Sequence, residues 1–178
     1  MKMRSLLAAL ALAVMASGCI LTSGQFLVSF ELGDVRVPGP TTLVSQVVDL
    51  NTISEYRDHK SNLKTLADLA LLGTITNNTS NPVDVEVWMT KDQTSYLLEQ
   101  DLKANGVRIW GPFHLAGNET KQVDWDTSAS LFDATGKAAL IGEIKGDGVF
   151  TLYAIGTTGL YDFSIHDGQF VAVLDAAL

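Results

Sequence analysis

The sequence predicts a mainly β protein: an antiparallel β-sandwich, immunoglobulin-like in the broad sense, with one to three short inserted helices. Three observations favour this class. About eight short segments are rich in β-branched and aromatic residues, the best of them alternate apolar and polar side chains, and most are bounded by Gly, Asn, Asp or Pro. Many short strands with small helical insertions are typical of a two-sheet sandwich, and an open or closed barrel is the alternative.

The first predicted elements are two strands and a short helix. Strands are expected over Phe26–Leu32 and Leu43–Leu50, where Val, Leu and Phe cluster between turn-forming residues. Ser54 precedes Glu55 and Asp58. Since a serine side chain can cap a helix and acidic groups are stabilised near its N-terminus, a short helix is expected to begin at Ser54.

The two central strands are predicted to form a hairpin. In Leu69–Asn77 the larger apolar side chains occupy odd-numbered positions, and Val83–Thr90 repeats this alternation more strictly. Asp84 and Glu86 face the other way in the second strand. The connection, residues 77–82, is rich in turn-forming residues and short enough for antiparallel pairing of the two strands.

The remaining elements are four strands and an Ala- and Leu-rich helical segment, residues 128–145. Strands are expected over Val107–Trp110, Thr120–Trp125, Val149–Gly156 and Tyr161–Leu174, the last interrupted at 166–168. Within the helical segment, Ser128 or Ser130 is the expected N-cap and Gly136 divides it into two short helices. Its expected packing face comprises Leu131, Phe132, Ala139 and Ile144.

Composition limits the function classes. The chain has 178 residues, 47% of them hydrophobic, a formal net charge of −8 and one Cys. The apolar content allows one packed domain, expected over residues 26–178, and argues against disorder. The acidic balance disfavours nucleic acid as a partner, because phosphate binding is driven by basic patches. The single Cys excludes an intramolecular disulfide.

The N-terminal segment is predicted to be an export signal. Lys2 and Arg4 supply positive charge, and residues 6–15 form an unbroken apolar run, as in secretory signals. The run is too short to span a bilayer, which takes roughly 20 apolar residues. It leads into a sequence that resembles the lipobox of bacterial lipoproteins: Ala16, Ser17, Gly18 and Cys19.

This resemblance implies a membrane anchor. Residues 1–18 would be the signal peptide, Cys19 would carry a diacylglycerol group on its thiol, and its new α-amine would be acylated, for example by palmitate. Two or three chains hold a protein on a membrane durably, whereas one does so only marginally. Ile20 follows the cysteine in place of an inner-membrane retention Asp, which favours the outer membrane of the cell envelope. The tether, 19–25, is short; an ordinary secretory signal is the alternative.

The sequence contains no recognisable catalytic or metal-binding constellation, and no enzyme activity, metal or cofactor is expected. The three His residues are far apart and are expected in solvated turns: His59, His114 and His166. Ser164 and Asp167 flank the third, but in a strand Ser164 and His166 lie about 7 Å apart and Asp167 points away. The acidic residues of interest are expected on a solvated surface, although a weak composite calcium site is the alternative: Asp124, Asp126 and Asp147.

Two tryptophans form the candidate binding surface. By strand parity, Trp88 shares the polar face of its strand, and Trp110 shares a face with Arg108. Exposed Trp beside polar groups is typical of recognition surfaces, and cover by helices or loops is the alternative. A basic stretch is a second anomaly and is expected either to face anionic lipid or to be solvated: Arg57, His59, Lys60 and Lys64.

These observations favour a lipid-anchored, non-catalytic interaction module whose partner is an envelope protein or a polysaccharide. Two alternatives remain open. An envelope hydrolase would bring carboxyl groups with raised pKa values together in a pocket. A structural subunit of a surface assembly would present long, unprotected edge strands.

Overall fold

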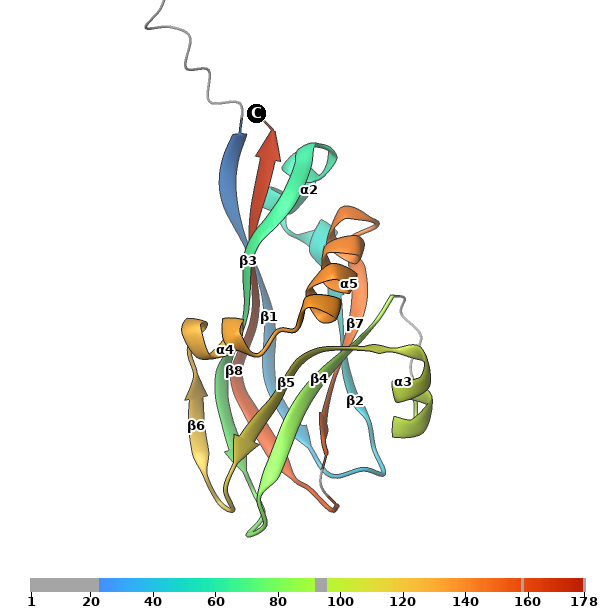
Figure 1. Ribbon diagram of the computed structural model, residues 1–178, viewed down its shortest axis with the longest axis vertical. Coiled ribbons are helices and arrows are strands. Elements are labelled where there is room, and N and C mark those ends of the chain that lie inside the picture. The colour runs from blue at the N-terminus through green and yellow to red at the C-terminus, as the bar shows by residue number, and fades with distance from the viewer. Residues whose placement is uncertain (1–22, 92–95, 158, 178) are drawn as a thin grey trace, which may run out of the picture.

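The computed structural model describes residues 23–91, 96–157 and 159–177. Within these ranges the chain forms two four-stranded antiparallel sheets that pack face to face (Figure 1). The predicted β-sandwich is therefore confirmed. The predicted lipobox, Ala16 to Cys19, lies outside the described residues. No helix in the described part of the chain is long and apolar enough to cross a membrane.

The strand order is that of an eight-stranded jelly roll. One sheet has the order β1-β8-β3-β6 and the other β2-β7-β4-β5. The first strand pairs with the last, the second with the seventh, the third with the sixth and the fourth with the fifth, the nested pairing of two Greek keys. The strands are β1 (Ser23–Val37), β2 (Val44–Asp49), β3 (Leu63–Asn77), β4 (Val83–Thr90), β5 (Val107–Leu115), β6 (Thr120–Val123), β7 (Val149–Gly156) and β8 (Phe163–Ala177).

The predicted hairpin between β3 and β4 is wrong, because the two strands lie in opposite sheets. Their connection crosses from one sheet to the other and is held by the buried side chain of Asn77. Its Nδ2 donates to the carbonyl oxygens of Asn81 (2.7 Å) and Ala116 (2.9 Å), and its Oδ1 accepts from the backbone N–H of Thr79 (3.0 Å). Turn-forming residues mark where a strand ends but do not fix which strand it pairs with.

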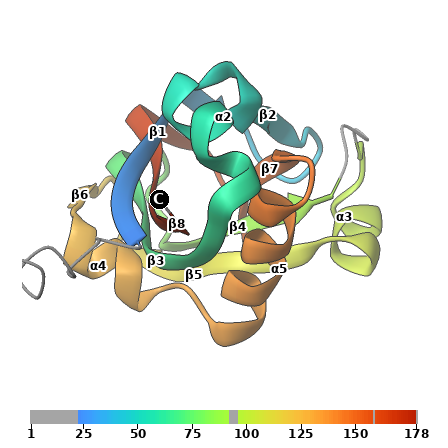
Figure 2. The same cartoon turned by 90° about the horizontal axis from the view of Figure 1, so that it is seen from above.

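Three long strands form an arm at one end of the sandwich. β1, β3 and β8 have 15 residues each and extend beyond the second sheet (Figure 1). The end of β8 and the start of β1 lie together at the tip of the arm, beside α2 (Ser54–His59) (Figure 2). β1 begins at Ser23, so the last part of the expected tether, 19–25, is already strand.

Within the described ranges the chain has four short α-helices, one more than the upper limit expected. They are α2, α3 (Glu99–Asn105), α4 (Trp125–Ser130) and α5 (Ala134–Lys145), and two single 3₁₀ turns flank α2: η1 (Leu50–Thr52) and η2 (Lys60–Asn62). α3 was not predicted, because only Leu102 in it is buried and the segment has no apolar periodicity. α4 lies against β3, and α5 lies against β5.

The helix caps differ from those predicted. The Asp124 carboxylate accepts from the backbone N–H of Thr127 at the start of α4 (2.9 Å), and the Asp133 carboxylate accepts from that of Gly136 at the start of α5 (2.6 Å). Aspartate is as effective a cap as the expected serines. The Ser54 hydroxyl bonds the Glu55 carboxylate and caps no backbone group.

The division of the 128–145 segment also differs from the expectation. The two helices are separated before Ala134, and Gly136 lies in the first turn of α5. A Cβ at Gly136 would lie 2.6 Å from the Cα of Ile109, so glycine allows this helix to approach β5 closely.

The main core fills the space between the sheets. The alternation predicted for β4 is confirmed, since its four odd positions are buried: Val83, Val85, Val87 and Met89. Phe150 and Phe170 meet edge to face across the two sheets, with ring centroids 5.7 Å apart. α5 adds Leu140 and Ile144 to this core. The predicted packing face of the segment is confirmed, since its four residues lie in the core or pack against it: Leu131, Phe132, Ala139 and Ile144.

Candidate functional site

Trp110 is a core residue, so its prediction as a binding surface is wrong. Its side chain is 2% exposed, and its Nε1 donates to the carbonyl oxygen of Ser128 (3.1 Å). The cause is a β-bulge. Trp88 pairs with Arg108 and the neighbouring Val87 pairs with Trp110, so Ile109 is an extra residue in β5 that turns Trp110 onto the core face.

Trp88 lies on the outer face of β4, as its parity predicts, and is half-buried. Its Nε1 donates to Oε2 of Glu86 (3.0 Å), and Nη1 of Arg108 donates to Oε1 of the same carboxylate (2.9 Å). Nη2 of Arg108 lies 3.7 Å from the Asp133 carboxylate. One nearly buried carboxylate thus fixes both the indole and the guanidinium.

These residues surround a shallow, open depression of about 470 Å³, here called the Trp88 depression. Three regions contribute to it: β4 and β5, the end of α3, and the start of α5. Its lining residues are Trp88, Gly106, Val107, Arg108, Asp133 and Thr135. An aromatic ring, a cation and an anion therefore meet on one accessible surface.

The indole of Trp88 rests on a small apolar cluster. Leu102 of α3, with Tyr153 and Ile155 of β7, forms a second core on the outer face of the sheet, and Trp88 packs against it. Immediately before α3, Leu97 and Leu98 are 79% and 61% exposed. Large apolar side chains are thus presented to solvent near the cluster that supports Trp88.

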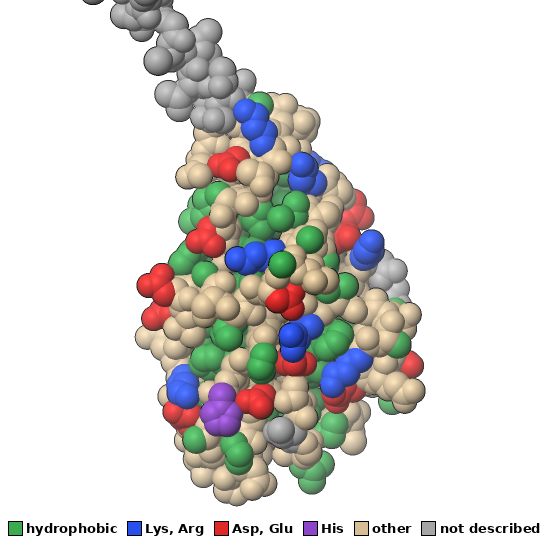
Figure 3. Space-filling view, viewed as in Figure 1, with side chains coloured by type: hydrophobic (Ala, Val, Ile, Leu, Met, Phe, Trp, Pro, Cys, Tyr) green, Lys and Arg blue, Asp and Glu red, His purple; other side chains and the backbone are tan. Residues whose placement is uncertain are grey.

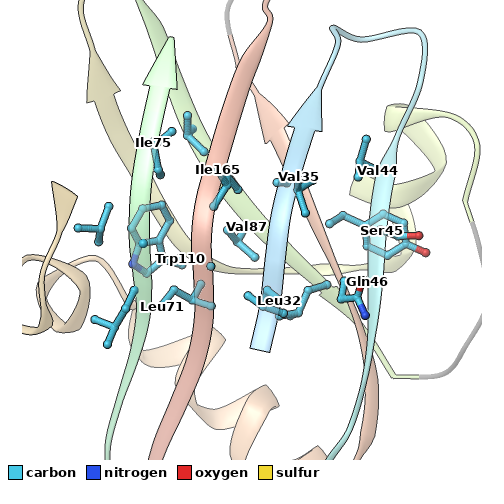
Figure 4. A pocket seen from close by; sticks show the side chains of 18 residues that line it. Leu32, Val35, Val44, Ser45, Gln46, Leu71, Ile75, Val87, Trp110 and Ile165 are labelled. Atoms are coloured by element: carbon cyan, nitrogen blue, oxygen red, sulfur yellow. The ribbon is translucent and has the colours of Figure 1, made fainter. Parts of the chain in front are cut away.

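A second cavity lies inside the sandwich (Figure 4). It has a volume of about 120 Å³ and is partly open to solvent. Leu71 and Trp110 line its interior, while Val35 of β1 and Val44 of β2 lie at the edges of the two sheets. This cavity was not predicted from the sequence.

The three histidines lie apart, each with its own partner. His114 Nδ1 is 2.8 Å from the Asp84 carboxylate, and His166 Nδ1 is 3.7 Å from that of Asp34. His59 Nδ1 is 2.9 Å from the carbonyl oxygen of Glu55 at α2. The Ser164 hydroxyl accepts from the Asn78 amide (3.0 Å).

Two of the three acidic residues considered for metal binding, Asp124 and Asp147, have structural partners, and Asp126 lies in the first turn of α4. Bonds from Thr127 at the helix start lower the pKa of Asp124. The Asp147 carboxylate accepts from the backbone N–H of Val149 (2.9 Å). Burial raises the pKa of Glu143, which lines neither cavity. In the described ranges, no three His, Cys, Asp or Glu side chains come together in a way that would hold a metal ion.

Two side chains of the basic stretch around α2, Arg57 and Lys60, donate to local acceptors. Lys60 Nζ donates to Asn51 Oδ1 (3.0 Å) and to the carbonyl oxygen of Asp147 (2.6 Å). Arg57 donates to the carbonyl oxygen of Asn51 (3.0 Å), and Lys145 Nζ donates to that of Lys64 (2.9 Å). Lys and Arg side chains are visible near the arm end of the molecule, at the top of Figure 3, with acidic groups among them.

No protein family matches the chain, and no curated protein matches it significantly. Solved structures align with it remotely. Desmodium yellow mottle tymovirus is 12% identical with a TM-score of 0.29, covering 88% of each chain. Turnip yellow mosaic virus is 10% identical with a TM-score of 0.31, covering 88% of this chain and 93% of the other. A latent aurone synthase (polyphenol oxidase) is 16% identical with a TM-score of 0.31, and the match spans 82% of this chain but 24% of that protein. Alignments this remote carry no functional argument.

Proposed function

We propose that this protein is an envelope lipoprotein, anchored through Cys19, whose sandwich is a non-catalytic interaction module that binds a partner protein at the Trp88 depression. The lipobox-like sequence ending at Cys19 supports the anchor and favours the outer membrane. The single observation that supports the binding site most strongly is the shared carboxylate of Glu86, which holds the indole of Trp88 and the guanidinium of Arg108 in place.

A fixed Trp beside a fixed Arg suits recognition for an energetic reason. Trp and Arg dominate the binding energy of many interfaces, and their contribution is larger when little side-chain freedom is lost on binding. In the unbound chain Trp88 packs on the Leu102 cluster, and Arg108 bonds the Glu86 carboxylate. Arg108 also remains 38% exposed, so its remaining donors can meet a partner.

The exposed leucines favour a protein over a polysaccharide. Leu97 and Leu98 lie at the start of α3, whose other end, Gly106, lines the depression, so a protein partner large enough to span this helix would bury them. A sugar chain would use mainly the ring of Trp88 and the polar groups beside it. The two partner classes therefore differ in whether these leucines contribute to binding.

The test is a pull-down from chemically crosslinked membranes. Wild type is compared with Trp88→Ala and with Trp125→Ala as the matched control, because Trp125 is also half-buried and also donates to a carboxylate, Asp68 Oδ2 (2.8 Å). We expect a partner protein that is lost with Trp88→Ala and kept with Trp125→Ala. The same partners in both variants would refute the Trp88 site, and capture of polysaccharide alone would refute the protein partner.

A subunit of a surface assembly is the second candidate, and β1 favours it. This strand has 15 residues and is the edge of its sheet within the described ranges, pairing there with β8. Against this role, the bulge of β1 near Gly33 and the charged residues of the strand lessen its tendency to pair with another chain. Sedimentation of the detergent-extracted protein tests this role, since an assembly subunit forms large, concentration-dependent oligomers and an interaction module does not.

A further inference from the structure

The cavity inside the sandwich has a defined structural cause in a row of glycines. Gly33 of β1 is paired with Gly168 of β8, and Gly73 of β3 lies next to them, since a Cβ there would be 3.3 Å from the Cα of Gly168. All three strands shift register at this level. The facing β7 contributes the small side chain of Ala154 to the cavity wall, together with Leu152 and Tyr153, and leaves the space between the sheets open.

Side chains at Gly73 and Gly168 would crowd the backbone of the neighbouring strands. A Cβ at Gly73 would lie 2.9 Å from the carbonyl oxygen of His166, and one at Gly168 would lie 3.0 Å from that of Gly33. Gly73 also has a φ of +146°, which side-chain-bearing residues rarely adopt. The void therefore follows from the backbone of the bulged sheet itself.

The cavity wall is apolar, and its polar groups lie at one end. None of the described residues that line it is charged, and its interior is formed by side chains such as Leu71, Val87 and Leu152. Ser45 and Gln46 of β2 also line it and are exposed. An apolar cavity of this kind stays dry and accepts apolar molecules.

The opening is the seam between the edge strands of the two sheets. Leu32 and Val35 of β1 face Val44 of β2 across this seam, and all three are partly exposed (Figure 4). β1 and β2 belong to different sheets, so no backbone hydrogen bonds close the gap. A slender molecule can enter here without breaking a strand pair.

Size and charge select the occupant. The volume of about 120 Å³ is somewhat below that of an engineered apolar cavity of roughly 150 Å³ that takes up benzene. It suits the end of one hydrocarbon chain and excludes a two-chain lipid. No cation lines the opening among the described residues, and Arg36, the nearest in β1, is paired with Asp162 at 2.6 Å. An uncharged head group is therefore favoured over a carboxylate.

We propose that this cavity binds a monomeric, single-chain amphiphile with an unbranched hydrocarbon tail and an uncharged head, such as a fatty alcohol or an acyl ester. The tail enters between β1 and β2 and lies against Leu71, Val87 and Trp110. The head stays at the opening, where Ser45 and Gln46 supply hydrogen bonds. This site is separate from the Trp88 depression, so its failure leaves that surface untouched.

Calorimetric titration of the mature chain, residues 19–178 carrying Cys19→Ala, tests this site, since without the apolar leader and the lipid neither membrane nor detergent competes. We expect saturable one-to-one binding of 1-octanol, with affinity rising about fourfold per methylene from 1-hexanol upward until the cavity is full. Octanoate at neutral pH is expected to bind at least tenfold more weakly. Absence of saturable 1-octanol binding, or equal binding of octanoate, would overturn the assignment.

Matched variants locate the binding. Ala154→Leu fills the cavity and is expected to abolish 1-octanol binding, whereas Ala138→Leu on the exposed face of α5 makes the same change elsewhere and leaves binding intact. If circular dichroism shows that Ala154→Leu is unfolded, Val44→Phe at the opening takes its place. Unchanged binding in the folded cavity variant would overturn the site. If the wild type cosediments with phosphatidylcholine vesicles and Ala154→Leu does not, the cavity takes a membrane lipid, and the choice of a monomeric ligand is overturned.

Discussion

The ion pair beneath the Trp88 depression is expected to be energetically coupled more strongly than a surface pair. The perturbations are Arg108→Met, Glu86→Gln and the double variant. Arg108→Met leaves a carboxylate that is 10% exposed without its cation, whereas Glu86→Gln leaves a guanidinium that is 38% exposed and still 3.7 Å from Asp133. The arginine variant should therefore be the more destabilised of the two.

The magnitude follows from the geometry. The pair is 2.9 Å apart. Two unit charges at about 4 Å attract by about 4 kcal/mol at an effective dielectric constant of about 20, while fully exposed pairs contribute only about 0.2–1 kcal/mol. With one partner nearly buried and the other partly solvated, we expect a coupling free energy of about 1–2 kcal/mol.

The assay is a double-mutant cycle on the free energy of unfolding, measured by urea denaturation. A coupling below about 0.5 kcal/mol would place Glu86 and Arg108 among ordinary surface pairs. It would then remove the reason for regarding Trp88 and Arg108 as fixed before a partner binds.

Three further predictions concern packing and pH. Ser128→Ala removes the hydroxyl that accepts from the buried N–H of Leu71 (2.7 Å) and is expected to lower the unfolding free energy by about 1–3 kcal/mol; an unchanged urea midpoint would contradict this. The guanidinium of Arg36 holds the pKa of Asp162 below its ordinary value. The stability that this carboxylate contributes is therefore present above about pH 4, and it is lost as the pH falls through the lowered pKa of the folded state. Asp162→Asn should therefore flatten the fall in Tm at acid pH, and parallel profiles for wild type and variant would refute that role. Ala154→Leu fills a cavity of about 120 Å³, whose cost to stability is at most about 3 kcal/mol at ~24 cal/mol per Å³. We therefore expect the unfolding free energy to rise by about 1–2 kcal/mol and the Tm by about 2–8 °C. A lower Tm would show that the space is already filled.

Local patterns predicted the strands well because alternation and turn residues act over short distances. Each of the eight predicted strands overlaps a strand of the structure, although β1, β3 and β5 are longer than predicted. The interruption predicted at 166–168 is a bulge at Asp167 within a strand that continues beyond it. The pairing of the strands could not be predicted from local patterns, because β3 pairs with β8, a strand far from it in the sequence. The β3 and β4 segments are adjacent in sequence and carry matching alternation, yet they lie in opposite sheets.

Only part of the candidate site could be predicted from the sequence, because local alternation fixes the face of a strand on which a side chain lies but not its contacts with other strands. Trp88 was placed correctly by parity, whereas Trp110 was not, because the extra residue Ile109 reverses the parity in β5. The contact between Glu86 and Arg108 joins two strands and has no local signature. The inner cavity did leave a signal, since glycine inside a strand marks a bulge or a close backbone approach, as at Gly73 and Gly168.

We propose that the protein works while attached to a membrane by its first mature residue. Mass spectrometry of the N-terminal peptide, from protein extracted out of purified cell membranes, tests this anchor. We predict a chain that begins at Cys19 and carries a diacylglyceryl thioether together with an acylated α-amine. A peptide that begins at another residue, or a free thiol at Cys19, would contradict the anchor and the envelope role built on it.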